Sequence, residues 1–353
     1  MIPRLVAGIV AFCCTVALHA QDKNPYKDVT GEVRLAALRH AQVWTPGDVA
    51  SKDMRLGPQD GAGFQPEAVV TCDYIEKKQS GTPKFDCVIA PDDKIRVKFG
   101  EKNGEIYSEV AATRLLWALG FGADRVYPVK VICNGCPENP MKNHEKDTVT
   151  REVPAAVVER KMEGDEIDEN EGWSWGELAF VDETSGGAPL AHRDALKLLA
   201  AMVQHTDTKP EQQRLVCLDR RQGRDPQNDG NCQHPFLIIQ DVGKTFGKAT
   251  LTNEDEKSAV NFEAWSRTPV WKDDDECVAQ LSKSFTGSLE HPKISEAGRQ
   301  FLSDLLAQLT DTQLRDLFTV ARFTQRDSTR SIDDWVGVFK QKREEIASRR
   351  CSE

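Results

Sequence analysis

"HTDTKPEQ", residues 205–212, is the stretch on which the fold assignment depends. It follows "AHRDALKLLAAMVQ" (191–204), whose apolar residues recur at helical spacing, and Pro210 requires that helix to end before it. A proton acceptor, a cation and an oxygen ligand for a metal ion are the groups that phosphoryl transfer needs. The loop offers such groups in His205, Asp207, Lys209 and Gln212. The alternative interpretation is a polar surface turn.

Upstream, "DKIRVKFG" (93–100) alternates like a half-buried strand, which places Lys98 opposite the apolar face. The next pattern, "SEVAATRLLWALG" (108–120), predicts a helix with Ser108 as its N-cap. Glu109 falls on the apolar face of that helix. A buried carboxylate needs a cation, and Lys98 is the nearest candidate partner in sequence. The alternatives are a solvated strand lysine and a glutamate that complements the helix dipole.

Downstream, "FLIIQDVGKTFG" (236–247) reads as a buried strand that ends at Asp241. Gly243 and Gly247 free the backbone directly after it. A carboxylate at a strand end beside glycine is a common way to hold Mg²⁺, which takes few protein ligands together with phosphate oxygens. The alternative is an aspartate that caps a turn.

In their sequence order, these pieces resemble the protein-kinase-like fold. "HTDTKPEQ" is similar to the kinase catalytic loop H-R-D-L-K-P-E-N, and "QDVGKTFG" is similar to the D-F-G magnesium motif. The trailing T-F-G, "EVAATRLLWALGFG" and "VVERKMEG" are more similar to the atypical branches, namely secretory-pathway kinases and the phosphatidylinositol-kinase-like group. The resemblance covers residues 75 to 250.

The resemblance implies ATP and Mg²⁺ or Mn²⁺ as cofactors and phosphoryl transfer to a hydroxyl on a protein, lipid head group or sugar. Lys98 would bind the α and β phosphates, and Glu109 would hold it. Asp207 would accept the hydroxyl proton, and Lys209 would steady the phosphoryl group. The full set is, for the nucleotide, Lys98, Glu109, Gly81 and Met162; for catalysis, Asp207 and Lys209; and for the metal ion, Asp241 and Gln212.

Three features depart from the family pattern. Gln212 stands where the family has a metal-binding asparagine, and its amide is one methylene further out. No G-x-G-x-x-G loop precedes Lys98, and "QSGTPKFDC" offers only Gly81. No A-P-E element follows Asp241. The alternative function is therefore a catalytically inactive, kinase-like binding module.

The N-terminus and the order of elements predict an exported protein with an α+β, two-lobed, protein-kinase-like fold. Residues 1–20 combine Arg4, an apolar run and a small residue at the end, as in a cleavable secretory signal peptide, with an uncleaved anchor as the alternative. An N-terminal extension (21–65) precedes a strand-rich N-lobe with its hinge (66–164) and a helical C-lobe (165–353). No stable membrane span is expected after cleavage.

Charge and cysteine content narrow the partners and the compartment. The net charge of −10 argues against a nucleic-acid partner, because backbone binding needs clustered Lys and Arg. Outside the signal, eight cysteines remain, which favours disulfides in an exported chain. Cys217 and Cys232 bracket a turn-rich loop, and we expect them to be bonded. "CNGC" (133–136) would alternatively form a zinc site with Cys72 and Cys87.

Overall fold

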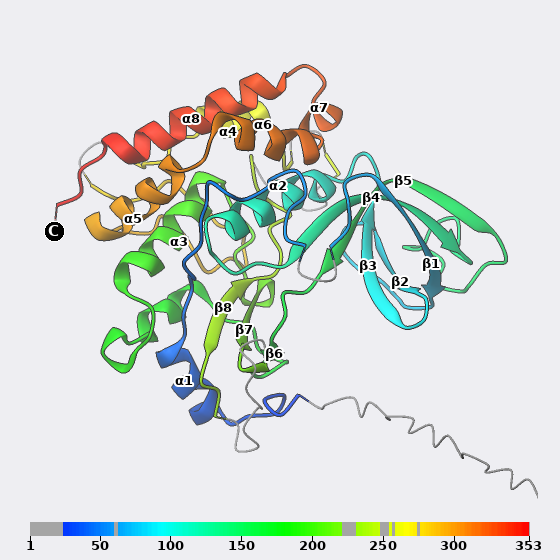
Figure 1. Ribbon diagram of the computed structural model, residues 1–353, viewed down its shortest axis with the longest axis horizontal. Helices are drawn as coiled ribbons and strands as arrows, with labels where there is room; N and C mark the ends of the chain where they lie inside the picture. Colours follow the sequence, from blue (N-terminus) through cyan, green and yellow to red (C-terminus); the bar gives the residue numbers. More distant parts are fainter. Residues whose placement is uncertain are drawn as a thin grey trace, which may run out of the picture.

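The computed structural model describes residues 24–59, 63–220, 231–247, 254–255, 258–273 and 276–352 (Figure 1). The predicted signal peptide lies outside these ranges. No helix within them combines the length and apolarity needed to cross a membrane. The predicted divisions at residues 65 and 164 stay predictions.

Five strands form a closed barrel in the order β1-β2-β3-β5-β4. Neighbours pair antiparallel, except that β1 closes the barrel by pairing in parallel with β4, with Cys72 opposite Cys133 in the register. Alternate residues point inward and form an apolar interior that includes Val70, Phe85 and Val97. The strands are β1 (Ala68–Ile75), β2 (Lys84–Ile89), β3 (Asp93–Phe99), β4 (Arg125–Asn134) and β5 (Thr150–Arg160).

The closed barrel overturns the prediction of a two-lobed kinase-like fold with a strand-rich N-lobe and a helical C-lobe. A second, three-stranded sheet, ordered β6-β7-β8, lies among the helices, so strands and helices are mixed in the second half of the chain. The main apolar core also runs continuously from Tyr26 through helix α2 to the C-terminal helices. The barrel closes because parallel pairing of β1 with β4 removes two exposed strand edges. The second sheet consists of β6 (Asp165–Glu166), β7 (Gln213–Cys217) and β8 (Pro235–Ile239).

Helix α2 (Glu105–Ala118) joins the barrel to the helices, since it packs against β4 on one side and α6 on the other. It begins earlier than the sequence predicted. Ser108 is not its N-cap but lies buried inside it, where its hydroxyl donates to the backbone oxygen of Gly243 at 2.6 Å. This bond fixes the segment after β8 against α2, because both groups are buried from water.

The remaining helices pack around the main core. N-caps at Ser295, Thr310 and Ser331 each accept a bond from a first-turn backbone N–H, and these caps start α5, α6 and α8. Between them, Trp265, Trp335 and Phe318 form an aromatic cluster. The helices are α1 (Gly31–His40), η1 (Trp175–Phe180), η2 (Glu183–Ser185), α3 (Leu190–Met202), η3 (Pro210–Gln212), α4 (Phe262–Arg267), α5 (Glu296–Ala307), α6 (Asp311–Val320), α7 (Phe323–Arg326) and α8 (Ile332–Ser348).

The N-terminal segment packs on the second sheet. Gln42, just after α1, forms a parallel bridge with Phe236 in β8, and the backbone N–H of Leu237 donates to Gln42 at 2.8 Å. Ala123, just before β4, forms a second parallel bridge with Ile239. The end of β8, where Asp241 follows, is thus held between two segments from the first half of the chain.

Four disulfides staple the described part of the chain, and they are compatible with export because disulfides persist in oxidising compartments. The expected Cys217–Cys232 bond is confirmed. The zinc alternative is wrong, because its four cysteines are consumed in two bonds, Cys72–Cys87 and Cys133–Cys136.

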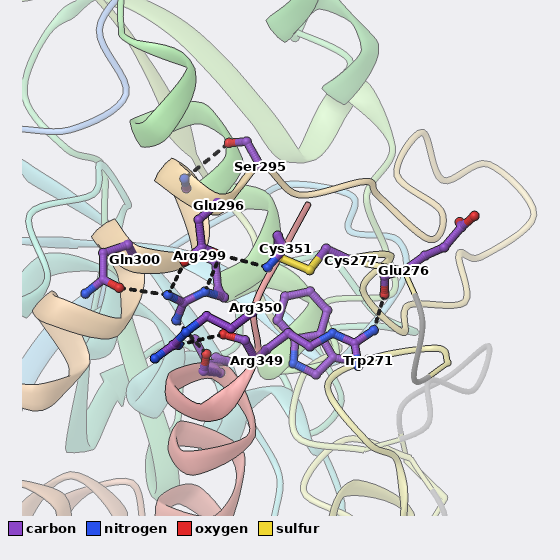
Figure 2. Close-up of a disulfide and its surroundings, with 12 residues drawn as sticks. Trp271, Glu276, Cys277, Ser295, Glu296, Arg299, Gln300, Arg349, Arg350 and Cys351 are labelled. Carbon is purple, nitrogen blue, oxygen red and sulfur yellow. Dashed lines mark hydrogen bonds and ion pairs between the residues drawn. A yellow bond between two sulfur atoms is a disulfide. The ribbon is translucent and has the colours of Figure 1, made fainter. Parts of the chain in front are cut away.

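The fourth disulfide, Cys277–Cys351, fastens the C-terminal end of the chain (Figure 2). The backbone N–H of Cys351 also donates to the Glu296 carboxylate at 2.9 Å. Beside it, the guanidinium of Arg349 lies over the ring of Trp271. The segment after α8 is therefore held by the disulfide, by the hydrogen bond to the Glu296 carboxylate and by the contact of Arg349 with the Trp271 ring.

Candidate functional site

A single buried lysine stands at the centre of the site. Lys98, on β3, is 3% exposed, and its ammonium contacts four carboxylates. Glu109 on α2 is the nearest, as the sequence predicted, so Lys98 is not a solvated strand lysine. The Nζ distances to the other three are 3.4 Å to Glu105, 3.6 Å to Glu159 and 3.6 Å to Asp241.

Burial and charge act in opposite directions on these groups. Burial alone would lower the pKa of Lys98, but Asp241, Glu109, Glu105 and Glu159 outweigh it and raise that pKa well above its ordinary value. Burial raises the pKa of Glu109 well above its usual range, despite the attraction of Lys98. The pKa of Asp241 is lowered, because Lys98 and the backbone N–H of Gly243 outweigh its burial. Asp241 is thus the carboxylate that stays ionised, while Glu109 resists ionisation.

Three of the carboxylates converge closely enough to hold a cation. One oxygen each from Glu105, Glu109 and Asp241 lie within 4.8 Å of one another. The second oxygen of Glu109 is buried without a hydrogen-bond partner. A Cβ added to Gly243 would come within 2.5 Å of the Glu105 side chain, so glycine is what lets the chain after β8 approach α2. Sequence reasoning missed Glu105, although it lies one helical turn before Glu109.

The loop between β1 and β2 reaches the same cluster. The hydroxyl of Thr82 donates to Glu105 Oε2 at 2.7 Å, and both side chains are buried. Gly81, the residue expected in a phosphate-covering loop, directly precedes Thr82 and has a φ of +80°. A residue with a Cβ would be strained at that φ.

The predicted catalytic loop lies beside the segment that carries Asp241. Gln212 links the two, because its side-chain amide donates to Asp207 Oδ2 at 3.3 Å and its backbone oxygen accepts the N–H of Asp241 at 3.2 Å. The backbone N–H of Thr206 also donates to the carbonyl of Lys244 at 3.3 Å. Asp207 and Asp241 are therefore held by one short set of backbone and side-chain contacts, not on opposite surfaces.

The two oxygens of the Asp207 carboxylate face different groups. Oδ2 lies 3.2 Å from Lys244 Nζ and 3.8 Å from Lys209 Nζ. Oδ1 accepts a hydrogen bond from the hydroxyl of Ser284 at 3.3 Å. Lys244 and Ser284 were missed in the sequence, although Lys244 directly follows the D-x-G segment. No sequence motif near Ser284 indicates that it contacts Asp207.

His205, the first residue of the loop motif, takes a packing role. It is 1% exposed among residues of α2 and α3, and neither ring nitrogen has a hydrogen-bond partner in the described part of the chain. Burial lowers the pKa of His205 to about 4, so the ring is neutral at neutral pH. It does not carry a proton for the carboxylates nearby.

Met162 lies apart from the lysine cluster. Its side chain packs on the apolar face of β7 and β8, and it lines a cavity of about 240 Å³ with the segment after α2. A separate cavity of about 260 Å³ is bordered by Glu211 and Gln240, which directly precede Gln212 and Asp241 in the chain. Met162 does not line that second cavity.

A buried ion-pair network holds the segment next to Met162. The backbone N–H of Met162 donates to Asp124 Oδ1 at 2.7 Å, and Arg214 bonds both Asp124 and Glu166. Burial raises the pKa of Asp124 to about 6, although Arg214 opposes this. The connection between β5 and β6 is thus tied to β7 and to the start of β4.

Comparison with known proteins gives a distant structural neighbour. No protein-family model matches the chain, and no curated protein matches it. Among solved structures, the chain is similar to the Helicobacter pylori proinflammatory kinase CtkA, with 11% sequence identity and a TM-score of 0.37. The similarity covers 79% of this chain and 99% of that one. A distant structural neighbour is thus a kinase, but at these values the activity does not transfer to this chain.

Proposed function

We propose that this protein transfers the terminal phosphoryl group of ATP to a hydroxyl acceptor, with Mg²⁺ or Mn²⁺ as its metal ion. The observation that carries the proposal is the contact of Lys98 with both Glu109 and Asp241, with Gln212 joining Asp241 to Asp207. Such a constellation supplies a cation for phosphates, a carboxylate for a metal and a carboxylate for a proton.

The residues fit a divalent cation. Glu105, Glu109 and Asp241 converge around one ammonium, and oxygen atoms gathered in this way are the ligands that a divalent cation takes. The unpartnered oxygen of Glu109 points to the same conclusion. A divalent ion there would neutralise the charge that develops on the phosphates. We propose Asp241 as a ligand of this ion, and the expected role of Gln212 as a second ligand stays a prediction, because its side-chain amide donates to Asp207.

The remaining roles follow from position. Lys98 would bind phosphate oxygens while Glu109 holds its ammonium in place. The loop with Gly81 would lie over the phosphates, which its contact with Glu105 through Thr82 supports. The nucleoside would occupy the cavity bordered by Glu211 and Gln240, and the role of Met162 in binding adenine stays a prediction.

In the chemical step, the acceptor oxygen attacks the γ-phosphorus and its proton passes to Asp207. The bond from that phosphorus to the β–γ bridging oxygen breaks, and ADP leaves. Lys209, aided by Lys244, would attract the transferred phosphoryl group, since both ammonium groups lie within 4 Å of Asp207 Oδ2. The acceptor is a hydroxyl on a protein, a lipid head group or a sugar.

A catalytically inactive binding module is the second candidate, and the crowding of Asp207 favours it. Its carboxylate contacts Lys209, Lys244, Gln212 and Ser284, all of which an acceptor must share or displace. Thermal melting of the mature chain with ATP and each metal separates the candidates when it is paired with an assay for ADP. Active transfer requires both a raised melting temperature and ADP release. A raised melting temperature without ADP release supports the binding module, and no shift with either metal contradicts both.

A further inference from the structure

A loop outside the predicted motifs is fastened to the catalytic loop by hydrogen bonds to Thr206 and Thr208. The backbone N–H of Ser284 donates to the carbonyl of Thr206 at 2.8 Å. Thr208 Oγ1 accepts the N–H groups of Ser288 and Leu289, each at 3.1 Å, and the Ser288 hydroxyl donates to the Thr208 carbonyl at 2.7 Å. These bonds are made to Thr206 and Thr208, the residues directly before and after Asp207. They therefore hold the loop against the segment that carries the Asp207 carboxylate.

The turn at the centre of this loop fixes the direction of Ser284. The N–H of Gly287 donates to the carbonyl of Ser284 at 3.0 Å, and a Cβ at Gly287 would lie 2.8 Å from Thr208 Oγ1. Ser284 is half-buried in this turn, while its neighbour Phe285 is fully exposed. The hydroxyl of Ser284 is thus directed at Asp207 while the loop tip faces solvent.

The hydroxyl of Ser284 contacts Asp207, which is the contact that the acceptor hydroxyl must make in the proposed mechanism. The Ser284 hydroxyl donates to Asp207 Oδ1, while Lys209 and Lys244 lie near Oδ2. Among the described residues, Ser284 is the one hydroxyl bonded to Asp207. Ser288 is turned to the backbone of Thr208 instead.

We propose that Ser284 is an acceptor in its own molecule: the protein phosphorylates this serine in cis. The proposal rests on the proposed function, because a nucleoside triphosphate must supply the phosphoryl group. The Ser284 oxygen attacks the γ-phosphorus, its proton passes to Asp207, the bond to the β–γ bridging oxygen breaks, and the diphosphate leaves. One phosphate per chain results. The phosphoserine then occupies the acceptor position beside Lys209 and Lys244, where both ammonium groups are able to pair with it.

The test is phosphate mapping of the mature protein after incubation with ATP and Mg²⁺ or Mn²⁺. Cleavage after Lys283 and Lys293 gives the peptide "SFTGSLEHPK", residues 284–293, which carries three hydroxyls. We expect one phosphate, located on Ser284 by fragmentation, with a first-order rate constant that does not change when the protein is diluted. Phosphate on any other residue, or a rate constant that falls in proportion to dilution, overturns the proposal.

Three variants and two parallel readouts make the result unambiguous. Ser284→Ala is expected to lose the phosphate, Ser284→Thr to keep it on the new hydroxyl, and Thr286→Val, on the same peptide, to be labelled like the wild type. ADP release and the nucleotide-dependent melting shift are measured on the same samples. If both are present without phosphate at Ser284, the proposal fails and the proposed function stands. If both are absent, the proposed function fails and the proposal with it.

Discussion

The ammonium of Lys98 lies 3.6 Å from Oδ2 of Asp241, so the barrel and the segment that follows the second sheet meet at a partly buried ion pair. Lys98 comes from β3, and Asp241 lies two residues after the end of β8. The same ammonium contacts Glu109 on α2, which packs against the barrel and against α6. The charged centre is therefore a structural junction as well as a candidate site, and the two roles make separate predictions.

Removing the ammonium should destabilise the fold in a pH-dependent way. Lys98→Met leaves buried carboxylates without their cation, and breaking a buried pair costs about 3 to 5 kcal/mol. The loss should shrink on acidification, because the carboxylates then become neutral. Urea unfolding at neutral and mildly acidic pH measures both effects. Lys94→Met, an exposed lysine on the same strand, is the matched control. Equal losses for the two variants would contradict a structural role for Lys98.

The disulfide that fastens the C-terminus should contribute more stability than the short one in the barrel. Cys277–Cys351 closes a loop with a sequence separation of 74 and Cys133–Cys136 one of 3. Loop-closure entropy assigns about 4 kcal/mol to the first and about 2 kcal/mol to the second. Denaturant unfolding of the two double Cys→Ser variants gives the comparison. A larger loss for the Cys133 and Cys136 pair would show that strain or packing, not chain entropy, dominates.

His205 should make the protein less stable in acid. Its folded pKa is lowered to about 4, against an ordinary value of 6.5, so the unfolded chain binds the proton more tightly. Its contribution is complete above pH 6.5 and is lost as the pH falls toward 4. The shift corresponds to about 3 kcal/mol. Asp124 acts in the opposite sense, because its pKa is raised to about 6 and its ionisation destabilises the fold as pH rises.

The measurement that isolates His205 is the difference between wild type and His205→Phe. Unfolding free energies are compared across this pH range, and the contribution of Asp124 is common to both proteins and cancels. The variant should lose part of the acid destabilisation, since phenylalanine suits the apolar surroundings and cannot titrate. Parallel pH profiles for the two proteins would show that folding does not lower the pKa of His205.

Local chemistry was sufficient to predict the centre of the site. A carboxylate on the apolar face of a helix needs a cation, and this argument alone paired Glu109 with Lys98. The turn-rich loop between Cys217 and Cys232 similarly identified their bond. The first inference depends on a helical hydrophobic pattern, and the second on turn-forming residues between two apolar runs.

Features that depend on distant pairing were not predictable. Parallel pairing of β1 with β4 closes the barrel, yet an alternating strand looks the same whether or not its edge is covered. The two-lobed prediction failed for that reason. Glu105 was missed because the helix was started at Ser108, and Ser284 because only tertiary hydrogen bonds bring its loop to Asp207.

The last prediction separates binding from turnover at the two aspartates. Asp241 contacts Lys98 and stays ionised, so it should be required for binding of ATP with its metal ion. Asp207 contacts the lysines and the Ser284 hydroxyl instead, and a group that accepts a proton acts mainly in the transition state. Asp241→Ala should therefore abolish the metal-dependent melting shift, whereas Asp207→Asn should retain most of it and lose transfer by about 10²- to 10⁴-fold.

Exposed Asp92, in the turn between β2 and β3, supplies the control for both variants. Asp92→Ala should keep the full melting shift and the full rate of ADP release, since it lies on the barrel surface away from the lysine cluster. If Asp207→Asn also loses the melting shift, Asp207 belongs to the binding site and not to the proton-transfer step. If wild type shows the shift but releases no ADP, the binding module is the better function. Gln212→Asn then becomes the informative change, because the shorter amide no longer reaches Asp207 and frees the carboxylate that an acceptor must contact.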